Sequence, residues 1–112
     1  MTVLTATSVP NNTAVNVAPA SVGTAPTQIA GGDIPSTGLL VNIINNSGGS
    51  MTVTVEDPGF TSLSNPPNEA AQSIANTADR WLRVMPSNVD PATGFALLTL
   101  STVTTVTYKM IK

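Results

Sequence analysis

Clusters of turn-forming residues divide the chain into short segments, most of which have the composition or the alternation of a β-strand. Residues 39–44 are apolar except for Asn42, which indicates a strand that is buried on both faces. Residues 51–56 alternate apolar and polar side chains, which is typical of a half-buried strand. The intervening residues 45–49, Asn-Asn-Ser-Gly-Gly, tolerate positive φ angles, so the two strands are predicted to form a hairpin.

The C-terminal part of the chain also consists of strand-like segments separated by turn-forming residues. Residues 80–85 have strand character and end at Pro86. Residues 90–94, Asp-Pro-Ala-Thr-Gly, have the pattern of a type I turn, and residues 94–101 and 102–111 are then expected to form a closing hairpin. About seven to eight short antiparallel strands at near-regular spacing predict an all-β fold, a small β-sandwich or barrel.

The N-terminal region is more ambiguous. Residues 2–9 and 13–18 are rich in Val and Thr and have β character, with a turn at residues 10–12, Pro-Asn-Asn, between them. Residues 18–35 contain three prolines and three glycines. We therefore expect residues 1–30 to form an extended N-terminal arm or edge strands, and residues 31–112 to form the β-sandwich domain.

A long connection is expected in the middle of the chain. Residues 57–59, Asp-Pro-Gly, end a strand, and residues 60–76 are predicted to form a loop. Residues 69–75 have helix propensity, with Asn68 in the position of an N-cap, but a helix of one or two turns is marginal on its own. The loop is the favoured interpretation.

Charged residues make up only 9% of the chain, where about 25% is usual, and Thr, Ser and Asn fill about a third of the positions. Four cations are too few to neutralise a row of phosphates, so no nucleic-acid partner is expected. The chain has no Cys and no His, which removes thiolate chemistry, the commonest metal ligand and the usual general base. We expect no cofactor, no metal and no catalytic residue, and hence a protein that is not an enzyme.

No membrane partner is expected either. The longest apolar runs are far shorter than the ~20 residues of a membrane-spanning helix. The first residues lack the basic start and apolar stretch of a signal peptide. The sequence therefore predicts a soluble protein made in the cytoplasm.

Three of the predicted strands, residues 2–9, 13–18 and 39–44, contain no charged side chain. Soluble β proteins usually protect exposed edge strands with Lys, inward-pointing charges or bulges. We therefore expect at least one edge to be covered by a neighbouring subunit in an assembly.

Trp81, the only tryptophan, lies between Arg80 and Arg83. Strand alternation places Trp81 and Arg83 on one face, and Arg80 with Leu82 and Val84 on the other. Trp and Arg are over-represented at the centres of protein interfaces, and a Trp also stacks on sugars. The alternative is a core tryptophan flanked by exposed arginines, and the pattern allows both.

Four short motifs carry a resemblance to small Thr/Ala/Val-rich β proteins encoded among the structural genes of tailed phages, especially phages of actinobacteria. They are Gly32-Asp33-Ile34-Pro35, Asn45-Asn46-Ser47-Gly48, Val53-Thr54-Val55-Glu56-Asp57-Pro58 and Asp90-Pro91-Ala92-Thr93-Gly94. The motifs span most of the chain, and they are turn and strand motifs that carry no active-site chemistry.

The resemblance implies a capsid decoration, or cement, protein of a double-stranded DNA phage. Such a protein binds the outer surface of the virion shell, often as a homotrimer, and stabilises it by bridging major capsid protein subunits. The interface residues expected on this basis are the arm (Thr2, Val3, Leu4 and Thr5) and the cluster of Arg80, Trp81 and Arg83. The alternatives are a tail, neck or fibre-associated β module, and a carbohydrate-binding module on the virion surface.

Overall fold

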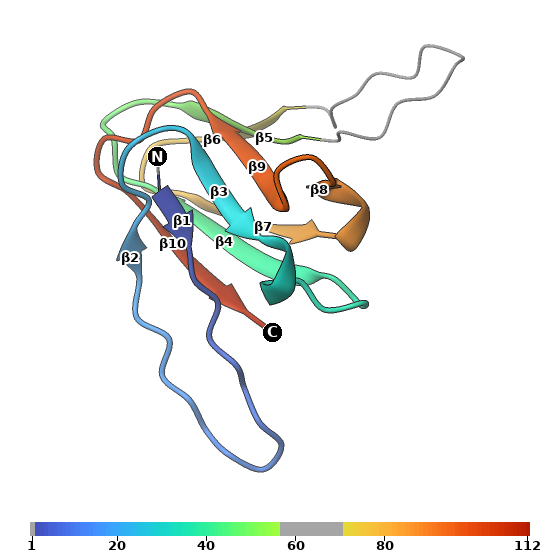
Figure 1. Cartoon of the computed structure of the whole chain (residues 1–112). Helices are drawn as coiled ribbons and strands as arrows, with labels where there is room; N and C mark the ends of the chain where they lie inside the picture. The colour runs from blue at the N-terminus through green and yellow to red at the C-terminus, as the bar shows by residue number, and fades with distance from the viewer. Residues whose placement is uncertain (1, 57–70) are drawn as a thin grey trace.

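The computed structural model describes residues 2–56 and 71–112, which fold into a small β-sandwich of two sheets (Figure 1). Within these residues the strands are β1 (Thr2–Leu4), β2 (Ala20–Ser21), β3 (Thr27–Ala30), β4 (Leu39–Asn45), β5 (Met51–Val55), β6 (Gln72–Ile74), β7 (Asp79–Val84), β8 (Val89–Asp90), β9 (Phe95–Leu100) and β10 (Val106–Ile111). Two 3-10 helices, η1 (Gly31–Asp33) and η2 (Pro86–Asn88), join strands. The predicted all-β sandwich is confirmed.

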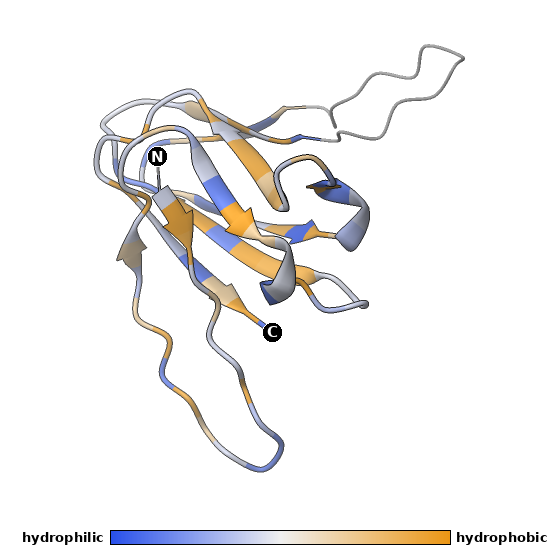
Figure 2. Ribbon diagram, in the orientation of Figure 1, coloured by the Kyte–Doolittle hydropathy of each residue, from blue (hydrophilic) through white to orange (hydrophobic). Residues whose placement is uncertain are grey.

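The two sheets share one apolar core. Sheet A has the strand order β1-β3-β9-β5-β6, with β8 also paired to β9, and sheet B has the order β2-β10-β4-β7. Alternate residues of the strands point inward, and Figure 2 shows the apolar residues concentrated along both sheets. Burial of a Leu or Ile side chain stabilises a fold by about 1.5–3 kcal/mol. The largest fully buried side chains come from both sheets: Leu4, Ile29, Leu39, Ile43, Met51, Ile74, Leu98 and Met110.

The predicted strands at residues 39–44 and 51–56 both form, but the hairpin between them is wrong. β4 belongs to sheet B and pairs with β10 and β7, whereas β5 belongs to sheet A and pairs with β6 and β9. The predicted closing hairpin of residues 94–101 and 102–111 is wrong for the same reason, since β9 lies in sheet A and β10 in sheet B. In both cases the connection carries the chain from one sheet to the other.

Asn45 shows what holds the first of these connections between the two sheets. Its side chain is fully buried, and its Nδ2 donates to the carbonyl oxygens of Gly49 (2.8 Å) and Ile74 (2.9 Å). Its Oδ1 accepts from the backbone N–H and the hydroxyl of Ser47 at 3.0 and 2.7 Å. These bonds satisfy the amide completely and tie the end of β4 in sheet B to β6 in sheet A.

A turn forms where residues 90–94 predict one. The backbone N–H groups of Thr93 and Gly94 donate to the carbonyl of Asp90 at 3.2 and 2.7 Å, and Gly94 adopts a φ of +78°. Asp90 Oδ1 also accepts from Ala92 N at 2.9 Å. The turn joins β8 to β9, which are antiparallel neighbours in sheet A.

Residues 1–30 were expected to form an arm or edge strands, and the structure uses part of them inside the sandwich. β3 lies between β1 and β9, and β1 pairs with it in parallel, so this part of the fold is not purely antiparallel. After β1 the chain moves to sheet B, where Thr7 and Val9 bond to the end of β10. Residues 13–18, predicted to be a strand, instead belong to a long loop that projects from the body of the molecule (Figure 1).

The stretch predicted as loop or short helix contains a strand. Residues 72–74 form β6, which pairs antiparallel with β5 and buries Ile74. The predicted turn at residues 57–59 and the potential N-cap Asn68 lie outside the described residues. Among the residues that the structure describes, no helix is long and apolar enough to cross a bilayer.

Candidate interaction surface

The outer face of sheet B is built from three strands in register. Thr107, Ile44 and Asp79 form one row across β10, β4 and β7. Lys109, Asn42 and Trp81 form the next row, and Ile111, Leu40 and Arg83 the third. Because directly opposed residues of antiparallel strands share a face, these nine side chains define one surface. We call it the sheet B face.

Trp81 lies on this surface, with 53% of the residue exposed. Val84 is buried and Leu82 half-buried on the inner side of β7, as strand alternation predicts. The alternative of a core tryptophan is therefore wrong. Arg83 shares the sheet B face, but Arg80 lies on the other side of β7 and donates from Nη1 to the backbone oxygen of Asp79 at 2.9 Å. The structure thus separates Arg80 from Trp81 and Arg83.

Asn42 anchors the centre of the sheet B face. It is almost fully buried although its side chain points outward. Its Nδ2 donates to Asp79 Oδ2 at 2.6 Å and to the carbonyl of Arg80 at 3.3 Å. Both acceptors belong to β7, so this amide fixes the start of that strand against β4 beneath Trp81.

A hollow of about 340 Å³ lies at one end of the sheet B face, where Leu40, Arg83 and Ile111 meet Val9, Pro35 and Lys112. Arg83 Nη1 donates to the carbonyl of Thr37 at 2.8 Å, which holds its guanidinium over the rim. Lys112 pairs with Asp33 at 3.1 Å, the only salt bridge among the described residues. The hollow therefore combines apolar walls with two cations, of which Arg83 has no carboxylate partner in residues 2–56 and 71–112.

The N-terminal residues expected at an interface, Thr2 to Thr5, do not belong to the sheet B face. Leu4 is fully buried in the core and is not available to a partner. Thr2 is tied to Thr24, its Oγ1 both donating to the carbonyl and accepting from the N–H at 2.9 Å. The N–H of Thr5 donates to Tyr108 Oη on β10 at 3.1 Å. Of β1, Val3 presents the most exposed apolar side chain, at 42%. β1 lies in sheet A and Trp81 in sheet B, so the two predicted groups do not form one site.

Within the described residues, the loop of residues 10–19 forms an exposed extension. It carries no charge, and every residue in it except the half-buried Val17 is exposed. The sequence offered a signal that was underused: Pro10 and Pro19 bracket the segment, and proline cannot donate to a sheet. Val and Thr content outweighed that signal in the prediction of a strand.

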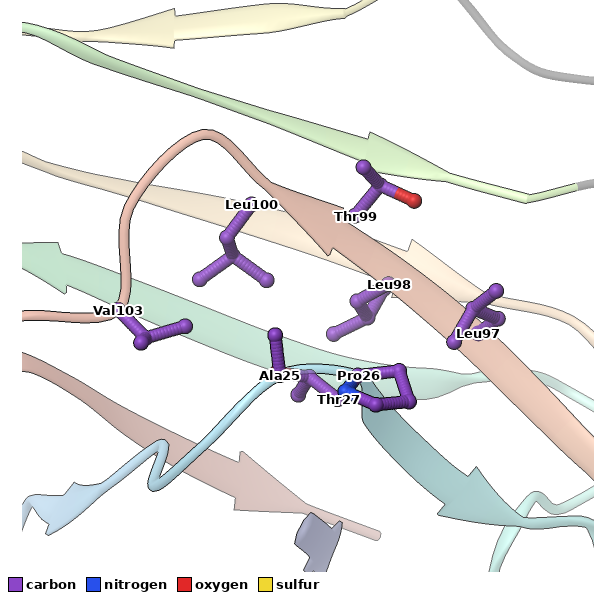
Figure 3. A pocket seen from close by; sticks show the side chains of 8 residues that line it. All are labelled: Ala25, Pro26, Thr27, Leu97, Leu98, Thr99, Leu100 and Val103. Atoms are coloured by element: carbon purple, nitrogen blue, oxygen red, sulfur yellow. The ribbon is translucent and has the colours of Figure 1, made fainter. Parts of the chain in front are cut away.

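A second hollow, of about 320 Å³, lies between the start of β3 and the end of β9 (Figure 3). Leu98, Leu100 and Val103 line it with the Ala25-Pro26 turn. The hydroxyl of Thr27, which is almost fully buried beside it, has no hydrogen-bond partner. Across the described residues, no three His, Cys, Asp or Glu side chains come together as a metal site would require.

No protein-family model, curated protein or solved structure matches this chain.

Proposed function

We propose that this protein is a structural component of a phage virion that binds the outer surface of the capsid and stabilises it by bridging major capsid subunits. The observation that carries the proposal is the sheet B face. On this face Trp81 is exposed, and three aliphatic side chains are half-buried: Leu40, Ile44 and Ile111. Arg83 and Lys109 lie beside them. Aromatic and Arg side chains on an apolar background are typical of the energetic centre of protein interfaces.

The low charge of the chain favours docking onto a protein surface by burial and neutral hydrogen bonds. Asp79 is the one carboxylate among the nine residues of the sheet B face. The apolar contacts of such an interface do not depend on ionic strength, whereas the contacts of Arg83 and Lys109 are weakened by screening. Decoration of a shell is also multivalent, so modest contacts repeated over many copies stabilise the particle.

The loop of residues 10–19 is the second element of the proposal. It leaves the body beside β10 and is long and uncharged, so it suits a role as an extension that lies across a neighbouring subunit. We give this loop the contact role that the resemblance implied for residues 2–5, because Leu4 is buried in the core. Removal of residues 2–9 is not a clean test of binding, because it also removes Leu4 from the core.

Binding to isolated capsids tests the proposal. Capsids of the encoding virus that lack this protein are mixed with Trp81→Ala or with the wild-type chain, and occupancy is measured by co-sedimentation. We expect Trp81→Ala to lose at least about tenfold in affinity, in line with the loss of an interface hot spot. Phe95→Ala is the matched control, since Phe95 is a half-buried aromatic on the outer side of sheet A.

A loop variant provides the second arm. Val9 bonds to Lys112 and Ala20 pairs with Tyr108, four residues apart along β10, so the ends of the loop span roughly 13 Å. A linker of five Gly and Ser residues in place of residues 11–18 bridges that gap and leaves both pairings intact. Unchanged capsid occupancy for both this variant and Trp81→Ala would remove the proposal.

The half-exposed Trp81 also supports the second candidate, a carbohydrate-binding module, because an exposed indole stacks on sugar rings. A glycan array probed with the wild-type chain separates the two functions. Binding to a glycan that Trp81→Ala abolishes, together with no binding to capsids, would favour the carbohydrate module. Copy number in the particle separates decoration from a tail, neck or fibre role, since only decoration approaches the copy number of the major capsid protein.

A further inference from the structure

β7 is the open edge of sheet B and the longest edge strand in the part of the chain that the structure describes. It spans Asp79–Val84, whereas the other sheet-end strands, β1, β2 and β6, have two or three residues each. An open strand presents unpaired backbone groups to any strand that can align with it. β7 is therefore the place where a further strand has most to bond to.

The bonds at the start of β7 determine which residues face the open side. Asn45 N donates to the carbonyl of Ala78 at 2.9 Å, and Thr77 N donates to the carbonyl of Asn45 at 2.7 Å. Thr77 has a φ of +66°, so residues 77 and 78 form a β-bulge opposite Asn45. Hydrogen-bonded pairs alternate along an antiparallel ladder. Arg80, Leu82 and Val84 thus bond to β4, and the N–H and C=O groups of Asp79, Trp81 and Arg83 point to the open edge.

The hydrogen bond made by the guanidinium of Arg80 supports this assignment of the open edge. Its Nη1 donates to the carbonyl of Asp79 at 2.9 Å. If that carbonyl faced inward, it would instead accept a hydrogen bond from β4. Arg80 therefore covers one acceptor of the open edge with its own side chain.

The open edge is complementary to itself. Asp79 and Arg83 stand two residues before and two residues after Trp81, and all three side chains lie on the sheet B face. A second β7 aligned antiparallel with Trp81 opposite Trp81 places each Asp79 opposite the Arg83 of the other copy. The outward backbone groups of all three residues then oppose each other, because the same residues face the edge in both copies. Of these groups, the carbonyl of Asp79 also accepts from Arg80.

We propose that β7 pairs edge to edge with β7 of a second copy of this chain, about a twofold axis at Trp81. Two Asp79–Arg83 pairs flank a central pair of Trp81 side chains in this arrangement. Opposite charges and aromatic residues in directly opposed positions both stabilise antiparallel strand pairs. Asp79 keeps an oxygen for this bond, since Asn42 bonds to its Oδ2, and Arg83 has donors beyond the one that Thr37 accepts.

The proposal goes beyond capsid binding and does not depend on it. The twofold axis is perpendicular to the sheet, so the sheet B faces of the two copies lie on the same side and form one continuous surface. The result is a dimer, in contrast to the homotrimer that the resemblance implies. A contact between two six-residue strands buries less than the roughly 1,200 Å² of a stable interface, so the dimer is weak and depends on concentration.

Sedimentation equilibrium over a wide range of protein concentration tests the pairing. Asp79→Arg places two cations on the edge of β7, and Arg83→Asp places two anions there. We expect each variant alone to dimerise at least about tenfold more weakly than the wild type, because like charges then face each other. The two variants mixed in equal amounts should form a heterodimer at about wild-type strength, since one edge is then cationic and the other anionic.

Two further variants separate this mechanism from a general charge effect. Lys109→Asp makes the same change in net charge as Arg83→Asp, but Lys109 lies on β10 and away from the edge, so dimerisation should be unchanged. Arg80→Ala uncovers the carbonyl of Asp79 and should leave the dimer at least as strong. Thermal unfolding followed by circular dichroism shows that each variant is folded.

The proposal is overturned if the wild-type chain stays monomeric up to about 1 mM, a concentration at which even a weak interface associates. It is equally overturned if the mixture of Asp79→Arg and Arg83→Asp fails to associate while both variants are folded. A trimer that neither variant weakens would place the contact between copies elsewhere.

Discussion

β1 closes sheet A at one edge and β7 closes sheet B at another, and the two strands differ in length, charge and burial. β1 has three residues, none of them charged, and its Leu4 is fully buried. β7 has six residues, three of them charged, and exposes Trp81. A short edge offers few backbone groups to a foreign strand and needs no charge to protect it. The long edge carries the charges, and their order around Trp81 makes them suited to recognition as well as to protection.

Of the three predicted strands without charge, only residues 2–9 contain an edge strand, β1, so the lack of charge alone does not identify an edge. The uncharged run at residues 39–44 is β4, which is paired on both sides by β10 and β7. Residues 13–18 form no strand. We therefore expect changes in β1 to alter folding stability, and changes on the open side of β7 to alter association.

The largest effect is expected at Leu4. Leu4→Ala removes a fully buried side chain that packs in the core shared by both sheets, so the free energy of unfolding should fall by about 2–5 kcal/mol. Urea denaturation followed by circular dichroism measures the change. Val3→Ala, on the exposed side of the same strand, is the control and should cost about 0.5 kcal/mol or less. If both variants lower the free energy of unfolding by equally small amounts, β1 contributes little to the stability of the sandwich.

The strands were predictable because apolar alternation is a local property of the sequence. β4, β5 and β7 lie within a residue or two of their predicted positions, and the Asp-Pro-Ala-Thr-Gly turn is where the sequence places it. Pairing was not predictable, because a loop such as residues 45–49 has the same local chemistry whether it joins two strands of one sheet or connects one sheet to the other. The deciding bonds run from Asn45 to Ile74, 29 positions away.

The candidate surface was predictable in part for the same reason. Alternation along β7 correctly separated Trp81 and Arg83 from Arg80. Which side of the strand faces the core depended on β4 and β10, and so on contacts between distant segments. The role of Leu4 was missed because three residues with no charge and no periodicity look alike as an arm and as a buried edge strand.

The next effect concerns the support beneath the β7 end of the sheet B face. Gly38 has a φ of +94°, and a Cβ there would lie 2.7 Å from Met85 Sδ and 2.8 Å from Arg83 Cγ. Gly38→Ala should therefore lower the free energy of unfolding by about 2 kcal/mol, from backbone strain and from displacement of Arg83.

Gly48→Ala isolates the backbone part of that loss. Gly48 has nearly the same φ, +96°, but no atom lies within 4 Å of the position of its Cβ. Gly48→Ala should lower the free energy of unfolding by about 1 kcal/mol, which is the penalty of an alanine in the left-handed conformation alone. Chemical denaturation of both variants measures the difference, and identical values would mean that Arg83 and Met85 do not rest on Gly38.

The smallest effect on stability is expected at Trp81, where the effect on association is large. Trp81→Ala removes a side chain from a residue that is 53% exposed, so the free energy of unfolding should change by less than about 1 kcal/mol. Leu82→Ala, the next residue and half-buried toward the core, should cost more. Denaturation curves and sedimentation equilibrium on the same samples compare the two properties. If Trp81→Ala destabilises the fold as much as Leu82→Ala does, Trp81 contributes to folding stability. In that case β1 and β7 do not differ as a stabilising edge and an associating edge.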